Sequence, residues 1–422
     1  MDYKLEPHQE KVIEYGLKNP YFIMAVDPGG GKTLAALHLA HILNKKLLVV
    51  CPSYLYLNWL DEIKKFYGNT KRVDGIRFPR DVYELWDTDI AVATYETAKA
   101  AEIIYKWADI VAFDEATNLK TMTSQRTEFA HRFVYEYSID RVILMSGTPI
   151  KNRVMEFYSL LAMCNYNPAI KKSKFLERFP DAITFADYFS HRKEFDIPTT
   201  KGSFRVIKWA GIKNINELKE LLLGIYIRID ESEFRKTDEP IFKMVKCDNK
   251  DIPGLAAEFE KFSSVYEDSV AGGAKMQSAI LAVPHTVKYV KDLLDITEKV
   301  VVFTDHVDSC KQIAEHFDIE PIHGGVSDKN RDRIKKQFQF GNQPVIAATY
   351  GSFSEGHTLT ASNHLVCNDP SWVPGTMRQA YNRINRMTQT KTCVIHQIIT
   401  SVQSESIYLT LQDKIKTIKL AT

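Results

Sequence analysis

The sequence predicts an α/β protein built from two doubly wound parallel-sheet lobes. Short, continuous apolar runs rich in β-branched residues alternate with stretches of helical apolar spacing, and this pattern occurs twice along the 422 residues. Strands that are apolar throughout are typical of parallel sheets that helices cover on both faces. The length allows two or three domains, so each half can have a core of its own.

The first lobe is predicted to span residues 1–245. Its expected strands are Tyr21–Val26, Leu47–Cys51, Ile90–Thr94, Ile110–Phe113 and Arg141–Met145, and Leu34–Leu43 has helical spacing. Residues from about 153 to 245 are aromatic and basic, with helical stretches such as Asn214–Leu223, and predict a helical appendage on this lobe. Residues 246–285 contain several glycines and a proline and are expected to form a linker with one helix.

The second lobe is predicted to span residues 286–422. Its expected strands are Lys299–Thr304, Glu320–His323, Pro344–Thr349 and Leu365–Asn368. Its expected helices are Val307–Phe317, Arg331–Phe338 and Ser404–Ile418. The alternation of strands and helices again indicates a doubly wound α/β lobe.

The composition excludes several classes of protein. Apolar content of 45% and charged content of 26% are ordinary for a soluble globular chain, and a net charge of +2 means that any basic surface must be local. None of the six cysteines forms a CxxC pair, so we expect neither a zinc site nor a disulfide framework. The N-terminus lacks the apolar segment of a signal peptide, and no apolar run approaches about 18 residues. We therefore expect a monomeric cytoplasmic protein, or a nuclear one in a eukaryote, without a membrane partner.

A glycine-rich segment between a strand and a helix predicts a phosphate-binding loop. Val26–Thr33 reads VDPGGGKT, and the loop comprises Pro28, Gly29, Gly30 and Gly31 before Lys32 and Thr33. Glycines let backbone N–H groups curl around phosphate oxygens, the lysine reaches the β- and γ-phosphates, and the threonine hydroxyl can hold Mg²⁺. The alternative is a glycine-rich turn with an incidental lysine, because Val26 stands where the strict pattern has glycine. The flanking strand and helix favour a site for ATP and Mg²⁺.

An acidic pair follows another predicted strand. Asp114 and Glu115 come directly after Ile110–Phe113, and a carboxylate at the end of a buried strand needs a cation or hydrogen-bond donors. We expect Asp114 to hold Mg²⁺ and Glu115 to polarise the attacking water. The alternative is that the pair only caps a helix.

Two further segments are less specific when each is taken alone. Leu144–Asn152 (LMSGTPIKN) runs from a strand into a small polar turn, and an ordinary β-turn is the alternative. In QAYNRINRMTQ, Arg383 and Arg386 are three residues apart and share a face if the segment is helical. Such a pair can neutralise a γ-phosphate held on another domain, and a solvated basic helix face is the alternative.

In this order, the segments resemble the motifs of the SWI/SNF-related branch of helicase-like superfamily two, over nearly the whole chain. The segments that carry the resemblance are LEPHQ with Gln9, VDPGGGKT, Thr94–Glu96, DEATNLK with Lys120, SGTPIKN, Thr349–Thr360 with Gly356, and QAYNRINRMTQ with Gln379. The resemblance implies two RecA-like lobes with ATP between them. It places Gln9, Gly356 and Gln379 beside the nucleotide, and Arg383 and Arg386 in the arginine-finger positions.

The region between the lobes is similar to that of fork-remodelling, annealing helicases. This similarity rests on Trp209-Ala210-Gly211 and on Tyr226-Ile227-Arg228. It implies an ATP-dependent translocase on double-stranded or branched DNA that serves replication, recombination or repair and works with proteins of those processes. The candidate nucleic-acid contacts are Tyr95, Lys120, Arg153 and Gly324. A motor with little beyond its two lobes would suit a bacterium or a phage-infected cell.

The sequence departs from the family pattern at positions that link the ATP and DNA sites. Thr117 stands where the family usually has histidine, and Lys151 where it usually has glutamine. His357 and Thr358 replace a usual Leu-Asn pair. We expect activity to survive these changes and the coupling between the two sites to differ in detail.

Three other functions remain open from the sequence. A strand-separating DNA or RNA helicase would need a wedge, and no separate wedge domain is evident. A motor that displaces proteins from DNA would use the same lobes, although no accessory module is recognisable. A catalytically inactive clamp is disfavoured because Lys32, Asp114, Glu115 and both arginines are present.

Overall fold

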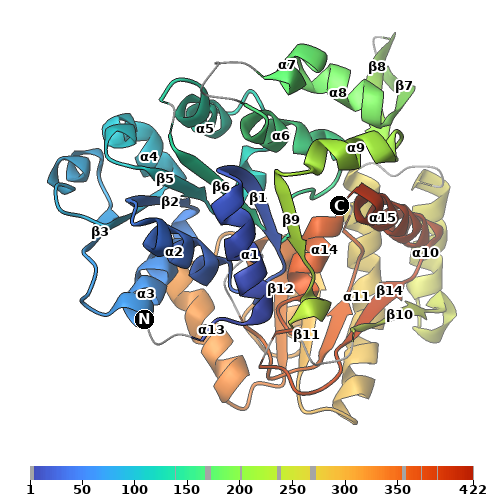
Figure 1. Cartoon of the computed structure of the whole chain (residues 1–422). Coiled ribbons are helices and arrows are strands. Elements are labelled where there is room, and N and C mark those ends of the chain that lie inside the picture. The colour runs from blue at the N-terminus through green and yellow to red at the C-terminus, as the bar shows by residue number, and fades with distance from the viewer. Residues whose placement is uncertain are drawn as a thin grey trace. The chain divides into compact units, whose positions relative to one another are not determined.

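The chain divides into two compact units, and each is described here by itself. The computed structural model describes residues 4–137, 139–166, 173–199, 202–234, 239–266, 272–353, 358–371, 373–386 and 388–421. The first unit comprises residues 1–234 and 416–422, and the second comprises residues 235–415 (Figure 1). None of the described helices is long and apolar enough to cross a membrane.

The first unit is built on a parallel seven-stranded sheet of order β3-β4-β2-β5-β6-β1-β9. Its strands are β1 (Tyr21–Val26), β2 (Leu47–Cys51), β3 (Val73–Ile76), β4 (Ile90–Thr94), β5 (Ile110–Phe113), β6 (Arg141–Ser146) and β9 (Tyr226–Ile229). The five strands predicted from apolar runs are the five inner ones. The two edge strands, β3 and β9, were not predicted because each is short and only partly buried.

Helices cover both faces of this sheet, so it has two cores. The covering helices are α1 (Pro7–Lys18), α2 (Lys32–Leu43), α3 (Tyr56–Tyr67), α4 (Tyr95–Ala100), α5 (Gln125–Tyr135) and α6 (Tyr158–Cys164). Alternate residues of β1 point to opposite faces: Phe22 packs in the core formed with α1–α3, and Ile23 in the core formed with α4–α6. Burial on both faces explains why the inner strands are apolar throughout.

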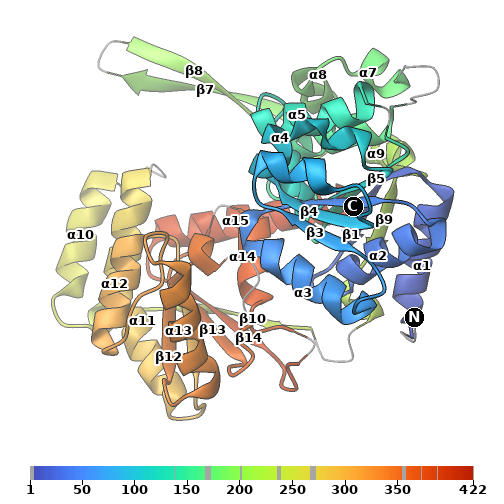
Figure 2. The same cartoon turned by 90° about the vertical axis from the view of Figure 1, so that its left-hand side faces the viewer.

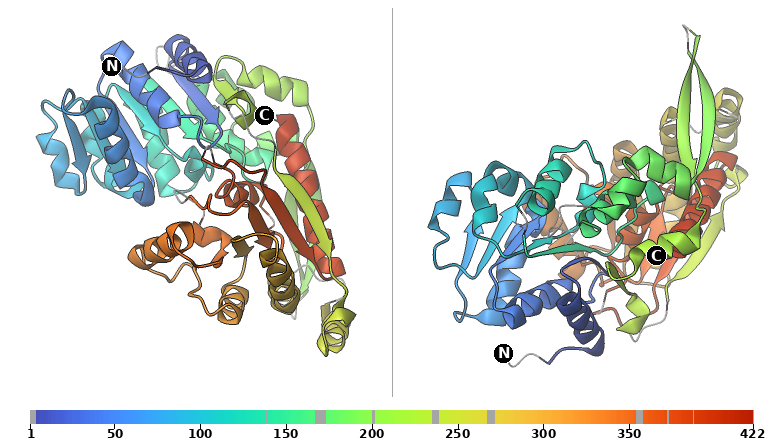
Figure 3. Two further views of the ribbon diagram at one scale, coloured as in Figure 1. Left: turned by 90° about the horizontal axis from the view of Figure 1, so that it is seen from below. Right: turned by 45° about the horizontal axis from the view of Figure 1, so that its top comes forward.

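The appendage of the first unit contains helices and a hairpin. Its helices are α7 (Lys174–Arg178), α8 (Ala182–Phe189) and α9 (Ile215–Leu222). Between α8 and α9, β7 (His191–Thr199) and β8 (Gly202–Ala210) pair antiparallel along their whole length. Figures 2 and 3 show this hairpin extending away from α8, while Phe185 and Phe189 of α8 pack into the core of the first unit. Helices were expected here from the sequence, and the hairpin was not predicted.

The second unit contains a parallel five-stranded sheet of order β10-β14-β13-β11-β12. Its strands are β10 (Ile241–Lys246), β11 (Val300–Thr304), β12 (Val345–Thr349), β13 (His364–Cys367) and β14 (Val394–Ile399). Strand β10 lies in the stretch assigned from the sequence to the first lobe, yet it pairs with β14 along its whole length. The predicted strand at Glu320–His323 is reduced to one isolated bridge between Ile322 and Ala348. The two parallel sheets confirm the predicted fold class.

Helices also cover both faces of the second sheet. They are α11 (Gly272–Leu294), α12 (Val307–His316), α13 (Asp328–Phe340), α14 (Pro374–Tyr381) and α15 (Val402–Ala421), and α10 (Leu255–Tyr266) packs on α11. Val302 packs on the face covered by α11 and α12, and Phe303 on the face covered by α13 and α14. The segment expected to be a linker with one helix therefore contains α10 and much of α11, which pack against each other.

Candidate nucleotide and nucleic-acid site

The predicted phosphate loop has the backbone geometry that an anion requires. Gly29 and Gly31 have φ angles of 91° and 79°, which favour glycine, and a Cβ on Gly30 would lie 2.5 Å from Val26 Cγ1. Helix α2 begins at Lys32 and has no side-chain cap, so the N-terminal end of the helix, with its partial positive charge, faces the loop. Lys32 Nζ donates to the Val26 carbonyl at 2.9 Å. The residues present therefore fit a bound phosphate group.

The start of α1 covers this loop. The Gln9 amide lies directly against Gly31, and His8 Nε2 is 3.1 Å from the Gly30 carbonyl oxygen. The His8 ring also packs on Phe234, with ring centroids 4.9 Å apart. Gln9 thus lies at the edge of the loop.

A buried ion pair fastens the loop to the edge of the sheet. Asp27 is 1% exposed, and Arg228 Nη2 of β9 donates to its Oδ1 at 2.6 Å. The Glu231 N–H donates to Asp27 Oδ2 at 3.0 Å, and Arg228 Nη1 donates to the Gly147 carbonyl at 3.2 Å. Although burial disfavours the charge of Arg228, the attraction of Asp27 raises its pKa. The pair joins residues 201 positions apart, and neither residue was assigned a role at the site from the sequence.

Asp114 is held in place at the end of β5. Trp59 Nε1 donates to its Oδ2 and the Glu115 N–H to its Oδ1, each at 2.8 Å. Burial and then the charge of Glu115 raise the pKa of Asp114 to about 6, while the charge of Lys32 opposes the increase. A buried carboxylate near a second carboxylate is stabilised by a cation, so the pair fits a Mg²⁺ ion.

Glu115 has an unusual backbone conformation. Its φ and ψ angles are 47° and 53°, the left-handed region that non-glycine residues seldom adopt. Its Oε2 is buried and makes no hydrogen bond within the described structure. Strained backbone is concentrated at functional sites, and an unpaired carboxylate oxygen remains able to accept a hydrogen bond from water.

The turn after β6 is held by a carboxylate that was assigned no role from the sequence. Glu156 Oε2 accepts from the N–H groups of Lys151 and Asn152, each at 2.9 Å. Glu156 Oε1 accepts from Lys120 Nζ at 3.0 Å. The segment after β5 and the turn after β6 are therefore tied together through one side chain.

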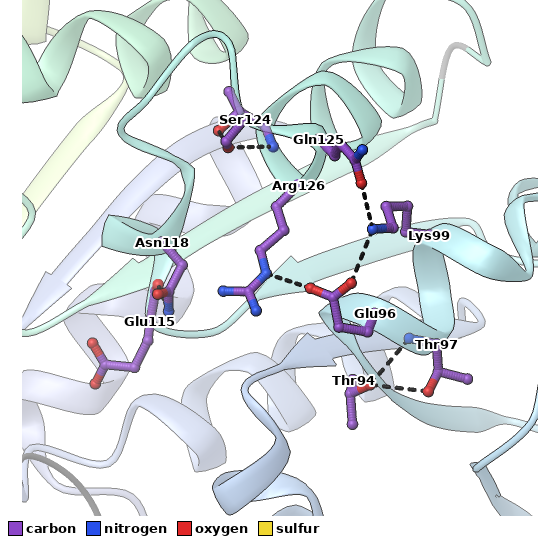
Figure 4. Close-up of polar contacts among 10 residues, drawn as sticks. Thr94, Glu96, Thr97, Lys99, Glu115, Asn118, Ser124, Gln125 and Arg126 are labelled. Atoms are coloured by element: carbon purple, nitrogen blue, oxygen red, sulfur yellow. Dashed lines mark hydrogen bonds and ion pairs between the residues drawn. The ribbon is translucent and has the colours of Figure 1, made fainter. Parts of the chain in front are cut away.

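A basic depression of about 480 Å³ lies on the first unit next to these segments. Its lining comprises four cationic and one acidic residue among polar ones: Glu96, Lys99, Thr117, Asn118, Lys120, Thr121, Ser124, Gln125, Arg126 and Lys151. Figure 4 shows Glu96 between two of the cations: Arg126 Nε donates to one carboxylate oxygen at 2.6 Å, and Lys99 Nζ to the other at 2.9 Å. Lys99 and then Arg126 lower the pKa of Glu96. Clustered cations of this kind can contact phosphate groups.

The structure separates the candidate nucleic-acid contacts. Lys120 lines the basic depression, and Arg153 is half-buried in the turn after β6, before the short helix at Val154–Phe157. Tyr95 is only 2% exposed, and its hydroxyl donates to the Asp114 carbonyl at 2.8 Å. Its side chain thus supports the acidic pair and does not reach the surface. Gly324 belongs to the second unit, where Arg331 Nη2 donates to its carbonyl at 3.2 Å.

The predicted arginine pair lies in the second unit, beyond the end of a helix. Helix α14 ends at Tyr381, so Arg383 and Arg386 occupy the following turn and do not form a helix face. Arg383 is 5% exposed, and its carbonyl accepts from the Leu359 N–H at 2.9 Å. Gln379 is half-buried on α14. Gly356 lies outside the described residues.

Two family models match the chain. Residues 8–233 match the SNF2-related domain, and residues 285–388 match the helicase conserved C-terminal domain. The first match alone covers more than half of the chain.

Individual relatives are distant. The chain is 26% identical over 430 residues to the DNA annealing helicase and endonuclease ZRANB3 of Bos taurus, covering 94% of this chain but 38% of that protein. It is 25% identical over 457 residues to the uncharacterized ATP-dependent helicase YqhH of Bacillus subtilis, covering 97% of this chain and 78% of that protein. Among solved structures, the Sulfolobus solfataricus SWI2/SNF2 ATPase core in complex with dsDNA aligns with a TM-score of 0.46 and 22% identity, over 99% of this chain and 93% of that one. The chain thus spans about two fifths of the first of these relatives.

Proposed function

The chain belongs to the SNF2-related family, and from this premise we propose that it is an ATP-dependent translocase on double-stranded DNA that remodels forks or branched DNA. One observation carries the proposal. The phosphate loop, the acidic pair and the segments that line the basic depression all follow strands of one parallel sheet, at the carboxyl ends where such sheets bind ligands. A nucleotide site and a phosphate-binding surface thus share the same edge.

The first lobe supplies the residues for ATP hydrolysis. Lys32 and the loop N–H groups bind the phosphates, and Thr33 and Asp114 are the residues that would hold Mg²⁺. When bound, Mg²⁺ neutralises charge on the phosphate oxygens. Glu115 accepts a hydrogen bond from the attacking water through its unpaired Oε2, and Gln9 reads the adenine.

In this proposal the second lobe supplies Arg383 and Arg386, which neutralise charge on the γ-phosphate in the transition state, together with Gln379 near the nucleotide. Closure of the lobes depends on ATP because both lobes bind the γ-phosphate, and hydrolysis then permits opening. A cycle of this kind moves the protein along DNA if each lobe binds the sugar-phosphate backbone of the DNA.

The basic depression supports a nucleic acid as the partner. Its cations lie in a chain of nearly neutral net charge, so the positive surface is local, as expected. Contacts to phosphates hold DNA without reading its sequence, which suits a translocase. The DNA annealing named for ZRANB3 supports forked or branched DNA as the substrate class.

The test is the rate of ATP hydrolysis with duplex DNA, forked DNA, single-stranded DNA and RNA at one fixed salt concentration. Strong stimulation by duplex or forked DNA is the expected result. Stimulation by single strands or RNA alone would contradict the assignment to double-stranded DNA. No hydrolysis under any condition would favour the inactive clamp.

A second candidate is strand separation, and the β7–β8 hairpin is the observation that favours it. This two-stranded ribbon has no other strand partner in the described structure, and Lys193 and Lys208 lie opposite each other on exposed positions. A projecting basic ribbon could part the strands at a fork. The discriminating assay is unwinding of a forked duplex by the full chain and by a variant with Lys193→Glu and Lys208→Glu. Unwinding that only the unchanged chain performs would favour the helicase.

A further inference from the structure

An acidic side chain, Glu96, stands among the cations of the basic depression. Among the described residues, it is the one carboxylate in a lining that also holds Lys99, Lys120, Arg126 and Lys151. Glu96 lies in the first turn of α4, directly after β4, so the sheet fixes its place. A carboxylate here repels the phosphates of DNA and so opposes the binding that the cations favour.

The Glu96 carboxylate holds two cations that come from different helices. Arg126 Nε of α5 donates to Glu96 Oε1 at 2.6 Å, and Lys99 Nζ of α4 donates to Oε2 at 2.9 Å (Figure 4). Lys99 Nζ also donates to Gln125 Oε1 at 2.9 Å, and the Arg126 guanidinium lies 5.9 Å from the centre of the Tyr95 ring. One carboxylate therefore orients one cation of each helix at the wall of the depression.

These bonds leave donors on both cations for an anion. Within the described part of the chain, Arg126 forms hydrogen bonds only through Nε, so both of its terminal amino groups can still donate. Figure 4 shows these amino groups turned away from Glu96. Lys99 uses two of its three N–H groups, on Glu96 and Gln125. The remaining donors suit a phosphate group, whose oxygens arginine binds through paired N–H bonds.

The two ion pairs matter more for binding than for stability. The side chains of Glu96, Lys99 and Arg126 are 54%, 28% and 45% exposed, and ion pairs at such exposure contribute little to the stability of a fold. Lysine and arginine side chains lose much rotamer freedom when they bind a ligand, and the pairing with Glu96 already restricts that freedom. Water and salt weaken the repulsion between Glu96 and a phosphate at the surface, so the prior ordering is the larger effect.

We propose that Glu96 is a positioning residue that strengthens DNA binding although it is negatively charged. It holds Lys99 and Arg126 in the orientation in which both contact a phosphate of the DNA backbone. Charge alone predicts the opposite effect, because removal of a carboxylate from a DNA-binding surface should tighten binding. This role rests on the proposed function and concerns the phosphate contacts of that same surface.

The test is a double-mutant cycle on the affinity of the full chain for a fluorescently labelled duplex DNA at one fixed salt concentration. Glu96→Ala should weaken binding by roughly fivefold, because two long side chains must then be ordered on binding. Glu96→Gln keeps the shape but loses the charge, and it should weaken binding by a smaller factor. In a Lys99→Met, Arg126→Met background, Glu96→Ala should instead tighten binding by up to about twofold, since only its repulsion of phosphate is then removed.

Glu128→Ala is the matched control. Glu128 is an exposed carboxylate two residues after Arg126 on α5, and it is not part of the lining of the depression. Its removal should not weaken binding. Thr94 Oγ1 accepts from the Thr97 N–H and caps α4 without Glu96, so circular dichroism should show an intact fold in the Glu96 variants.

The outcomes separate this proposal from the proposed function. Unchanged or tighter binding by Glu96→Ala would overturn the positioning role, and equal weakening in both backgrounds would identify Glu96 as structural. If the unchanged chain binds only single-stranded DNA or RNA, the assignment to duplex DNA fails, and the same cycle on that ligand still decides the role of Glu96. If the unchanged chain binds no nucleic acid, both proposals fail.

Discussion

The ion pair between Arg228 and Asp27 gives the sharpest prediction for stability. Arg228→Met keeps much of the side-chain volume but removes the cation paired with buried Asp27, which still accepts from the Glu231 N–H. Removing one partner of a buried ion pair costs about 3–5 kcal/mol because the remaining charge is uncompensated. The variant also loses the bond to the Gly147 carbonyl, so β9 and the turn after β6 should both loosen from the phosphate loop.

The double variant Asp27→Asn with Arg228→Met should be more stable than the single one. It removes the uncompensated charge and retains an amide oxygen that can accept from the Glu231 N–H. Its remaining cost is the loss of ordinary hydrogen bonds, roughly 1–2 kcal/mol. The second substitution should therefore recover about 2–3 kcal/mol, a coupling that only residues in direct contact show.

Urea unfolding followed by tryptophan fluorescence measures these differences, since four of the five tryptophans precede residue 234. Two lobes can unfold separately, so the transition of the first lobe should be fitted by itself. Binding of a fluorescent ATP analogue reports whether the loop retains its shape. A double variant as unstable as the single one, or a single variant that loses less than about 1 kcal/mol, would refute the reasoning.

Three further predictions concern catalysis and pH. Lys32→Ala or Glu115→Gln should abolish ATP turnover while circular dichroism shows an intact fold; near-normal turnover in either would contradict the site assignment. Arg386→Ala should retain ATP affinity and reduce the hydrolysis rate by roughly 10³-fold, because it acts on the transition state; equal losses of affinity and rate would indicate a structural arginine. Burial lowers the pKa of His131 from 6.5 to about 4, so the unfolded chain takes up the proton first. The contribution of His131 to the free energy of unfolding should be fully present above about pH 6.5, and the free energy should fall by about 2 kcal/mol by about pH 5. A glutamine side chain does not titrate, so His131→Gln should flatten this pH dependence. An unchanged pH dependence in urea unfolding of the variant would contradict the assignment to His131.

The sequence determined the parts of the protein that depend on local pattern. Continuous apolar runs predicted the inner strands of the first sheet, because a strand buried on both faces needs apolar side chains at every position. The residues of the phosphate loop were also evident, since successive glycines followed by Lys32 and Thr33 combine backbone freedom with a cation. The order of such segments was sufficient to indicate the family.

Only the tertiary structure decided the features that depend on pairing across the chain. Strand β10 joins the second sheet through β14, about 150 residues away, and no local pattern specifies such a partner. The same holds for Arg228 beside Asp27, and for Tyr95, whose buried hydroxyl supports the acidic pair and does not face DNA. The basic depression is lined by residues that follow β4, β5 and β6, because parallel strands bring distant loops to one edge of a sheet, an effect of register that composition and spacing do not encode.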